Sequence, residues 1–316
     1  MRTPIRLIFP VLVALLLPSL GIAAEPAETV PKPAPTRVDV PYGPHPRNVL
    51  DFYQAPSDKP TPVVIYMHGG AWSNGDKKDV AKTGFEKYLA AGISVVSINY
   101  RYTRQAKEQG VTPPVQGPMQ DAARAVQFVR SKAAEWNIDK ARVATSGTSA
   151  GACTSLWLAF HNDLADPANN DPVARESTRL KCVAVNVAQT SLDPAQMKEW
   201  TPNSNYGGGA FGFKDTKPRD GQFAEFLARR DEMLPWIREY SPYELATADD
   251  PPVYLIYLAP PALGQPQKDP THTATFGVKL QEKLQSIGVG CELVYPGAPD
   301  VKHAAMEDFL IEKLKE

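Results

Sequence analysis

The chain has 316 residues, of which 43% are hydrophobic and 22% are charged, and its formal net charge is −1. The hydrophobic share excludes a disordered chain, and the near-neutral charge gives no support to nucleic-acid binding, which needs a broad basic surface. Proline, with 31 residues, stands well above its usual share of roughly 5%, whereas the 21 glycines are ordinary, so the chain is not collagen-like.

The first 24 residues have the features of a secretory signal peptide. Arg2 and Arg6 give a positive start, an apolar run follows at 7–17, and small residues at 21–24 offer a cleavage site. The apolar run is shorter than the ~20 residues of a membrane span. We therefore expect a secreted or periplasmic protein without an integral membrane segment, and an uncleaved N-terminal anchor is the alternative.

Residues 25–36 are rich in Pro, Ala and Glu and predict an extended tether. From residue 37 onward, short apolar runs alternate with amphipathic segments, which is typical of a parallel sheet covered by helices. Strands are expected at 38–40, 49–53, 62–67, 94–99, 142–146, 183–187, 253–258 and 292–295. The first two alternate and predict an edge hairpin, and the continuous apolar run at 62–67 predicts a buried central strand.

Apolar residues at helical spacing predict helices at 121–136, 150–160, 275–287 and 304–314. No internal repeat is visible, so we expect a single catalytic domain over residues 37–316. The segment 189–250 carries many aromatic residues and a run of three glycines. It is expected either to roof a substrate pocket as a lid or to form a satellite hydrophobic cluster under a long loop.

The sequence GTSAG at 147–151 is a G-x-S-x-G pentapeptide between a predicted strand and a predicted apolar helix. A strand that turns sharply into a helix crowds the positions two residues before and after the serine, so these positions favour glycine. Ser149 is thereby presented at the carboxyl edge of the sheet and at a helix N-terminus, where negative charge is favoured. This context predicts a nucleophilic serine.

The sequence HGGAW at 68–72 directly follows the predicted central strand. Acyl transfer places negative charge on the substrate carbonyl oxygen, and backbone N–H groups aimed at that oxygen stabilise it. Gly69 and Gly70 are the expected donors, together with the amide of Ala150 after the nucleophile. His68 is expected to order this loop and not to act as a base.

Together these motifs resemble the α/β-hydrolase esterases, and within them the hormone-sensitive-lipase-like and feruloyl-esterase-like branches. The resemblance rests on HGGAW, NYRY at 99–102, Asp121 in a helix that ends in WNID at 136–139, and GTSAG. It implies an α/β class, single-domain α/β-hydrolase fold with a mostly parallel central sheet, and a serine hydrolase that uses neither cofactor nor metal. The chain departs from the family at Ala152, where glycine is frequent, and in its acid loop.

The resemblance also implies that nucleophile, acid and base follow one another along the chain. His303 lies after the last predicted strand, where the family places its base, and is therefore assigned as the base. His161 ends the helix behind the serine and is expected to point away from it. His272 opens another helix and is expected to be a cap or a surface residue.

The acid is expected at Asp269. The family has its acid about eleven and fifteen positions before two buried leucines of the next helix, and Asp269 stands in this relation to Leu280 and Leu284. Residues 259–268 are then an insertion in the acid loop. Asp193 and Asp300 remain alternatives, and Asp193 also fits a helix N-cap before a proline.

The expected activity is hydrolysis of small carboxylic esters with short or medium acyl groups through an acyl-enzyme, by analogy including acylated carbohydrate. An aryl-formamidase or a peptidase on the same fold is the alternative, and a degenerate hydrolase used for binding is a third. Cys153, Cys182 and Cys291 allow at most one intramolecular bridge and are expected to be small core residues, none at zinc-ligand spacing.

Overall fold

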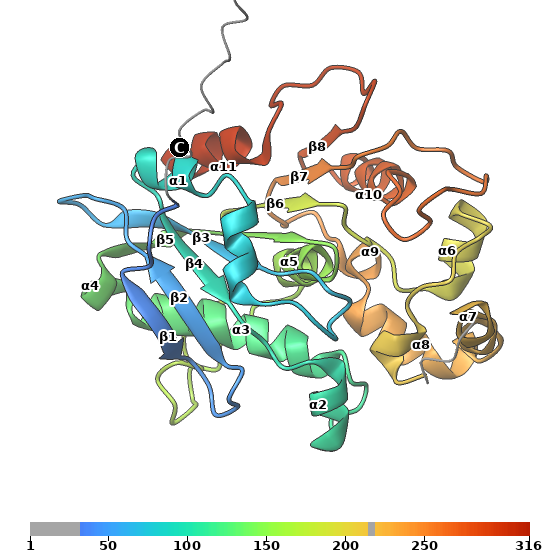
Figure 1. The fold of residues 1–316 in the computed structure, drawn as a ribbon, viewed down its shortest axis with the longest axis horizontal. Helices are drawn as coiled ribbons and strands as arrows, with labels where there is room; N and C mark the ends of the chain where they lie inside the picture. The colour runs from blue at the N-terminus through green and yellow to red at the C-terminus, as the bar shows by residue number, and fades with distance from the viewer. Residues whose placement is uncertain (1–31, 214–218) are drawn as a thin grey trace, which may run out of the picture. The chain divides into compact units, whose positions relative to one another are not determined.

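One eight-stranded sheet runs through the protein in the order β1-β2-β4-β3-β5-β6-β7-β8 (Figure 1). The computed structural model describes residues 32–213 and 219–316, and residues 33–316 form one unit. The predicted signal peptide and most of the predicted tether lie outside the described residues. The strands are β1 (Arg37–Pro41), β2 (Val49–Tyr53), β3 (Thr61–Met67), β4 (Ser94–Ile98), β5 (Ile138–Thr148), β6 (Cys182–Asn186), β7 (Val253–Ile256) and β8 (Cys291–Val294).

The predicted edge hairpin and parallel sheet are both present. Strand β1 pairs antiparallel with β2, and β2 pairs antiparallel with β4. All remaining neighbours, from β4 through β3 to β8, are parallel. Strand β5 is longer than expected because it continues beyond its apolar centre at both ends, where Ile138 pairs with Thr61 and Thr148 pairs with Asn186.

Side chains on the strands alternate between two hydrophobic clusters, one on each face of the sheet. On β3, Val63 and Ile65 belong to the larger cluster, whereas Val64 and Tyr66 belong to the smaller one. This alternation follows from the two-residue period of a strand. Because both faces are covered, the central strands are apolar throughout, and every residue of β3 is buried.

Helices cover both faces of this sheet. Those of the first half of the chain are the 3₁₀ helix η1 (Lys77–Lys82), α1 (Glu86–Ala90), α2 (Thr103–Glu108), α3 (Gln116–Ser131), α4 (Ala133–Trp136) and α5 (Ala150–Phe160). The second half contributes α6 (Pro194–Trp200), the 3₁₀ helix η2 (Gly208–Phe211), α7 (Arg219–Ala228), α8 (Arg230–Tyr240), α9 (Pro242–Leu245), α10 (Thr275–Ser286) and α11 (Met306–Lys315). Residues of α1 and α11 build the smaller cluster, and residues of α3, α5 and α10 build the larger one (Figure 1).

The expected helix at 121–136 is two helices. Helix α3 begins five residues earlier, at Gln116, and ends at Ser131, because the backbone of Lys132 leaves helical values with ψ near 2°. Helix α4 then ends where Asn137 adopts the left-handed conformation, with φ of 52°. Asparagine tolerates this conformation better than most residues, so it is a natural helix stop.

Candidate active site

Ser149 sits in a strained turn between β5 and α5. Its backbone has φ of 54° and ψ of −119°, in a region that residues other than glycine rarely adopt. A Cβ atom on Gly147 would lie 2.6 Å from the backbone of Gly151, and one on Gly151 would lie 2.1 Å from the Met67 carbonyl oxygen. Both positions therefore require glycine, and the serine side chain is held out at the carboxyl edge of the sheet.

A histidine and an aspartate lie in line with this serine. The Oγ of Ser149 is 2.9 Å from Nε2 of His272, and Nδ1 of His272 is 2.8 Å from Oδ2 of Asp269. Since a carboxylate only accepts hydrogen bonds, Nδ1 carries a proton and donates a hydrogen bond to Asp269. In the neutral ring Nε2 is then free to accept the serine proton, which is the arrangement of a nucleophile, a base and an orienting acid.

The prediction of His303 as the partner of Ser149 is wrong. Nδ1 of His303 lies 2.9 Å from Glu292, and Nε2 lies 3.0 Å from Glu312. Both ring nitrogens therefore face carboxylates, and neither faces the nucleophile. The loop after β8 holds this histidine against α11, whereas the residue expected to be a cap or surface group, His272, occupies the base position.

The acid and the histidine beside Ser149 come from a single turn with the spacing D-x-x-H. Oδ1 of Asp269 accepts the backbone N–H groups of Thr271 and His272, at 3.1 and 3.2 Å, so the aspartate folds the turn and its other oxygen orients the ring. Burial raises the pKa of Asp269, but the hydrogen bond and charge of His272 outweigh this effect and leave the pKa below its ordinary value. The D-x-x-H spacing of Asp269 and His272 is visible in the sequence and could have identified His272 as the partner of this acid.

The segment 189–250 anchors this turn from the other side. Asn203 donates to the carbonyl of Gln267 and accepts the Gln267 amide, at 2.8 and 2.9 Å. The side-chain amide of Gln189 donates through Nε2 to the backbone carbonyl of Thr271 at 2.8 Å, next to His272. The segment therefore supports the turn that carries His272, a role that the sequence did not predict.

The alternative acids have other partners. Asp193 caps α6 by accepting the Ala195 amide at 2.8 Å, and it forms a two-pronged ion pair with Arg230 at 2.7 and 2.6 Å. Asp300 lies exposed in the loop after β8, and no hydrogen bond from it to a histidine is found in the described part of the chain. His161, at the end of α5, faces Glu239 and not the serine, as expected.

The loop after β3 places backbone N–H groups beside the serine. A Cβ atom on Gly69 would approach Cβ of Ser149 to 3.4 Å and the Thr148 carbonyl oxygen to 2.8 Å, so this backbone passes directly against the nucleophile. Gly70 has φ of 104° and is enclosed by Asn74. Within residues 32–213 and 219–316, no hydrogen bond is found that the amides of Gly69, Gly70 or Ala150 donate.

Two hydrogen bonds fix the peptide groups that contain the amides of Gly69 and Gly70. The Tyr100 hydroxyl donates to the carbonyl of His68 at 2.7 Å, and Nδ1 of His68 donates to the carbonyl of Gly69 at 2.7 Å. In a trans peptide the carbonyl and the following N–H point in opposite directions. Because these two carbonyls are held, the directions of the N–H groups of Gly69 and Gly70, which belong to the same two peptide groups, are held as well.

His68 keeps this geometry as a neutral ring. Its side chain is fully buried, and burial lowers its pKa to about 4. Since Nδ1 donates to a carbonyl, Nε2 of the neutral ring is an acceptor, and Nη2 of Arg47 lies 3.4 Å from it. The His68 ring also stacks on Tyr100, with ring centroids 4.2 Å apart.

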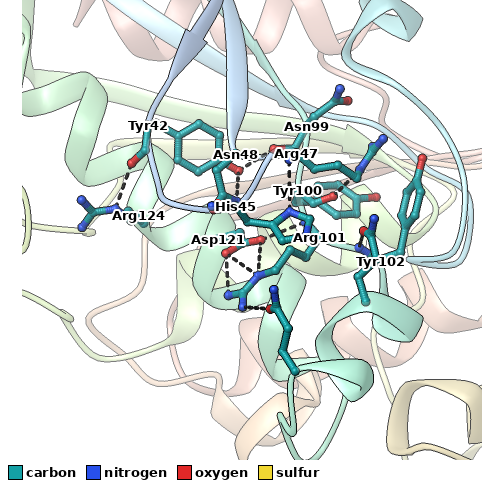
Figure 2. Close-up of polar contacts among 12 residues, drawn as sticks. Tyr42, His45, Arg47, Asn48, Asn99, Tyr100, Arg101, Tyr102, Asp121 and Arg124 are labelled. Atoms are coloured by element: carbon teal, nitrogen blue, oxygen red, sulfur yellow. Dashed lines mark hydrogen bonds and ion pairs between the residues drawn. The ribbon is translucent and has the colours of Figure 1, made fainter.

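Arg47 reaches this loop from the turn between β1 and β2. Its Nε donates to the carbonyl of Tyr100 at 2.8 Å, and its Nη2 donates to the carbonyl of Gly75 at 3.2 Å. Its guanidinium also lies 3.8 Å from the centre of the Tyr102 ring. Figure 2 shows the hairpin residues Arg47 and Asn48 against the segment that follows β4. Below them, Arg101 and Asp121 form a close ion pair at 2.7 Å, which ties that segment to α3.

The described part of the chain holds no group of three or more histidine, cysteine or acidic side chains arranged to bind a metal ion. Its three cysteines are unpaired, and Cys153 and Cys182 are buried. None of its helices is both long and apolar enough to cross a membrane.

Known proteins are similar to this chain. Esterase LipQ of Mycobacterium tuberculosis is 32% identical over 154 residues, which are 48% of this chain and 33% of that protein. Kynurenine formamidase of Debaryomyces hansenii is 30% identical over 135 residues, which are 40% of this chain and 41% of that protein. The chain thus spans about a third of the length of the first curated relatives it matches.

A solved structure of a truncated carbohydrate esterase from gut microbiota matches with a TM-score of 0.65 at 21% identity, over 89% of this chain and 96% of the other. At this level of identity the match shows the fold, which is that of the α/β-hydrolases. Residues 50–260, more than half of the chain, match the model of the BD-FAE family. The chain therefore belongs to the BD-FAE family.

Proposed function

We propose that the protein hydrolyses small carboxylic esters through an acyl-enzyme formed on Ser149. The observation that carries the proposal is the line of hydrogen bonds from Ser149 to His272 to Asp269, at 2.9 and 2.8 Å. The proposed base is therefore His272 in place of His303, and the proposed acid remains Asp269. Esterase LipQ, by its name, performs this class of reaction.

In the proposed reaction, His272 accepts the Ser149 proton at Nε2 while the serine oxygen attacks the ester carbonyl carbon. The amides of Gly69, Gly70 and Ala150 stabilise the oxyanion, and donors of this kind are worth about 2.7–4 kcal/mol each in other enzymes. His272 then protonates the leaving alcohol and activates the water that releases the acid. Asp269 holds the ring in the required tautomer and stabilises its charged form.

The natural substrate is proposed to carry a short or medium acyl group, on a carbohydrate or another small alcohol. The carbohydrate esterase with the same fold supports this choice by analogy. We also propose that the protein is exported, which rests on the positive start, apolar run and small residues of segment 1–24.

Formamide hydrolysis is the second candidate, because kynurenine formamidase is among the similar proteins. The same serine, base and oxyanion donors serve both reactions, so the substrate must distinguish them. A protein that only binds its ligand is less favoured, because the site retains a serine, a histidine and an acid in hydrogen-bonding geometry.

Labelling with a fluorophosphonate probe, followed by assays with 4-nitrophenyl acetate and butyrate, tests the proposal. We expect labelling and ester turnover in the native chain and neither in Ser149→Ala. Turnover of an aryl formamide without ester turnover would favour the second candidate. A folded native chain that is not labelled would contradict both enzymatic functions.

A further inference from the structure

A cavity of about 380 Å³ opens beside residues 68–70, which carry the proposed oxyanion donors and are called the oxyanion loop. Ala71, which directly follows Gly70, forms part of its wall together with Trp72. The opposite walls come from helix α2 and from the glycine-rich segment around η2. The volume lies within the range of small-molecule pockets, roughly 300–1,000 Å³.

The lining of this cavity combines aromatic rings with cationic groups. Trp72 and Tyr206 lie with their ring centroids 6.5 Å apart, and Phe213 contributes a third ring. Arg104 and Lys107 of α2 add two positive charges. Among the described residues that line the cavity, none is acidic.

Both cations are available to a ligand. Lys107 has a long contact of 3.4 Å with the Gly212 carbonyl, at the far wall of the cavity. Arg104 lies 3.7 Å from Glu108, and its side chain is 78% exposed, so this pair is weak and exchangeable. A carboxylate that enters the cavity can therefore contact either group without the loss of a buried ion pair.

The position of the cavity indicates which half of an ester it receives. The leaving alcohol must lie against His272, because this residue protonates it in the proposed reaction. The described lining of the cavity contains no residue of the turn that carries Asp269 and His272, but it does contain the continuation of the oxyanion loop. The cavity therefore adjoins the residues that follow the oxyanion glycines and not the turn that faces the leaving alcohol, which is the placement expected for the acyl group.

We propose that this cavity selects acyl groups that carry a terminal carboxylate, with Arg104 and Lys107 as the residues that determine this specificity. The substrates are monoesters of dicarboxylic acids, whose apolar middle lies on the aromatic wall and whose carboxylate meets the two cations. The inference rests on the proposed ester hydrolysis and names the substrate class of that site.

A second cleft, of about 530 Å³, is lined by the oxyanion glycines Gly69 and Gly70 themselves and does not fit an anion. Its described lining includes Asp79 and Glu307. Its lysine, Lys82, is already bound to Asp79 at 2.6 Å. A negatively charged acyl group is therefore expected in the first cavity and not in the second.

The test compares two esters that differ in one charge. The substrates are 4-nitrophenyl hydrogen adipate and methyl 4-nitrophenyl adipate, which share their leaving group and the length of their acyl chain. In the native chain we expect a higher kcat/KM for the ester with the free carboxylate. The ratio of the two kcat/KM values should fall as salt rises from 0.05 to 0.5 M, because exposed charges are screened.

The double variant Arg104→Gln, Lys107→Gln should lower this ratio about tenfold, with little change for the methyl ester. The control is the double variant Arg37→Gln, Lys132→Gln, which also removes one arginine and one lysine. These two residues pair with Glu135 and are not among the residues that line the cavity. This control should leave the ratio unchanged.

Two results would overturn the inference and leave the proposed function intact. One is turnover of the methyl ester with no preference for the charged ester in the native chain. The other is a preference that the double variant retains or that the control removes equally. Failure to hydrolyse either ester, with no labelling of Ser149, would instead overturn the proposed function and the inference with it.

Discussion

At the scale of single residues, the base beside Ser149 is identified by local geometry and not by the order of motifs along the chain. The position after the last strand predicted His303 as the base, and the distance to the buried leucines of the next helix predicted Asp269 as the acid. His272 lies three residues after Asp269 in the same turn. Because Asp269 both folds this turn and orients the His272 ring, the more distant His303 is not needed beside Ser149.

The two histidines give a matched pair of variants. We expect His272→Gln to lower kcat for 4-nitrophenyl butyrate by at least about a thousandfold, because His272 is the base found in hydrogen-bonding distance of Ser149 among the described residues. His303→Gln should retain kcat within about twofold. It should also lower the melting temperature, because it disturbs the contacts of His303 with Glu292 and Glu312.

Steady-state kinetics and a thermal melt of both variants check this prediction. Circular dichroism establishes that each variant is folded before its rate is compared. A folded His303→Gln variant that loses activity while His272→Gln keeps it would restore the base position expected from the order of the motifs.

At the scale of elements, strands were predicted more successfully than the helices of segment 189–250. Apolar runs such as 62–67 and 183–187 identify buried strands because both faces of the sheet are covered. Helices α6 and α9 are only seven and four residues long, so they complete few turns and leave little periodic pattern. Their positions depend on packing against the rest of the domain, which local sequence does not contain.

The hairpin of β1 and β2 supports the oxyanion loop through Arg47, and this support predicts a specific kinetic effect. Arg47→Gln should lower kcat about tenfold and change KM less than twofold. The oxyanion donors are used mainly in the transition state, and loss of one whole donor costs roughly 10²–10³ in kcat elsewhere. Arg47→Lys should recover only part of the loss, since a lysine cannot reach several carbonyls at once.

Arg124 provides the control, because it supports the same hairpin at a different point. Its Nε donates to the carbonyl of Tyr42 at 2.9 Å (Figure 2), and no hydrogen bond from it to His68 is found among the described residues. Arg124→Gln is expected to lower stability but to leave kcat nearly unchanged. Equal losses of kcat in the two variants, or a rise in KM alone for Arg47→Gln, would contradict a specific effect on the oxyanion loop.

For the molecule as a whole, the sheet order explains why motifs so far apart in sequence meet at one edge. Strands β3, β5 and β6 are parallel neighbours, so the HGGAW loop, Ser149 and Asn186 all follow carboxyl ends on the same side. The Ser149 amide donates to the Asn186 carbonyl at 3.0 Å, which joins two of these ends directly. The sequence predicted these strand ends, but the position of the turn at 269–272 depends on the segment 189–250 that anchors it.

The buried neutral His68 makes the stability of the whole domain depend on pH. In the unfolded chain its pKa returns to about 6.5, whereas burial holds it at about 4 in the fold. Between these values the unfolded state binds the extra proton, so the free energy of unfolding decreases as the pH falls through this window. The full effect is roughly 3 kcal/mol, and about 1 kcal/mol of it appears between pH 7 and pH 5.5, above the range where carboxylates titrate. Urea unfolding at these two pH values should therefore show a smaller decrease for His68→Gln than for the native chain, and His161→Gln, which removes a histidine elsewhere in the fold, serves as the control. The same pH dependence in all three chains would mean that His68 takes up its proton in the folded state as readily as in the unfolded one.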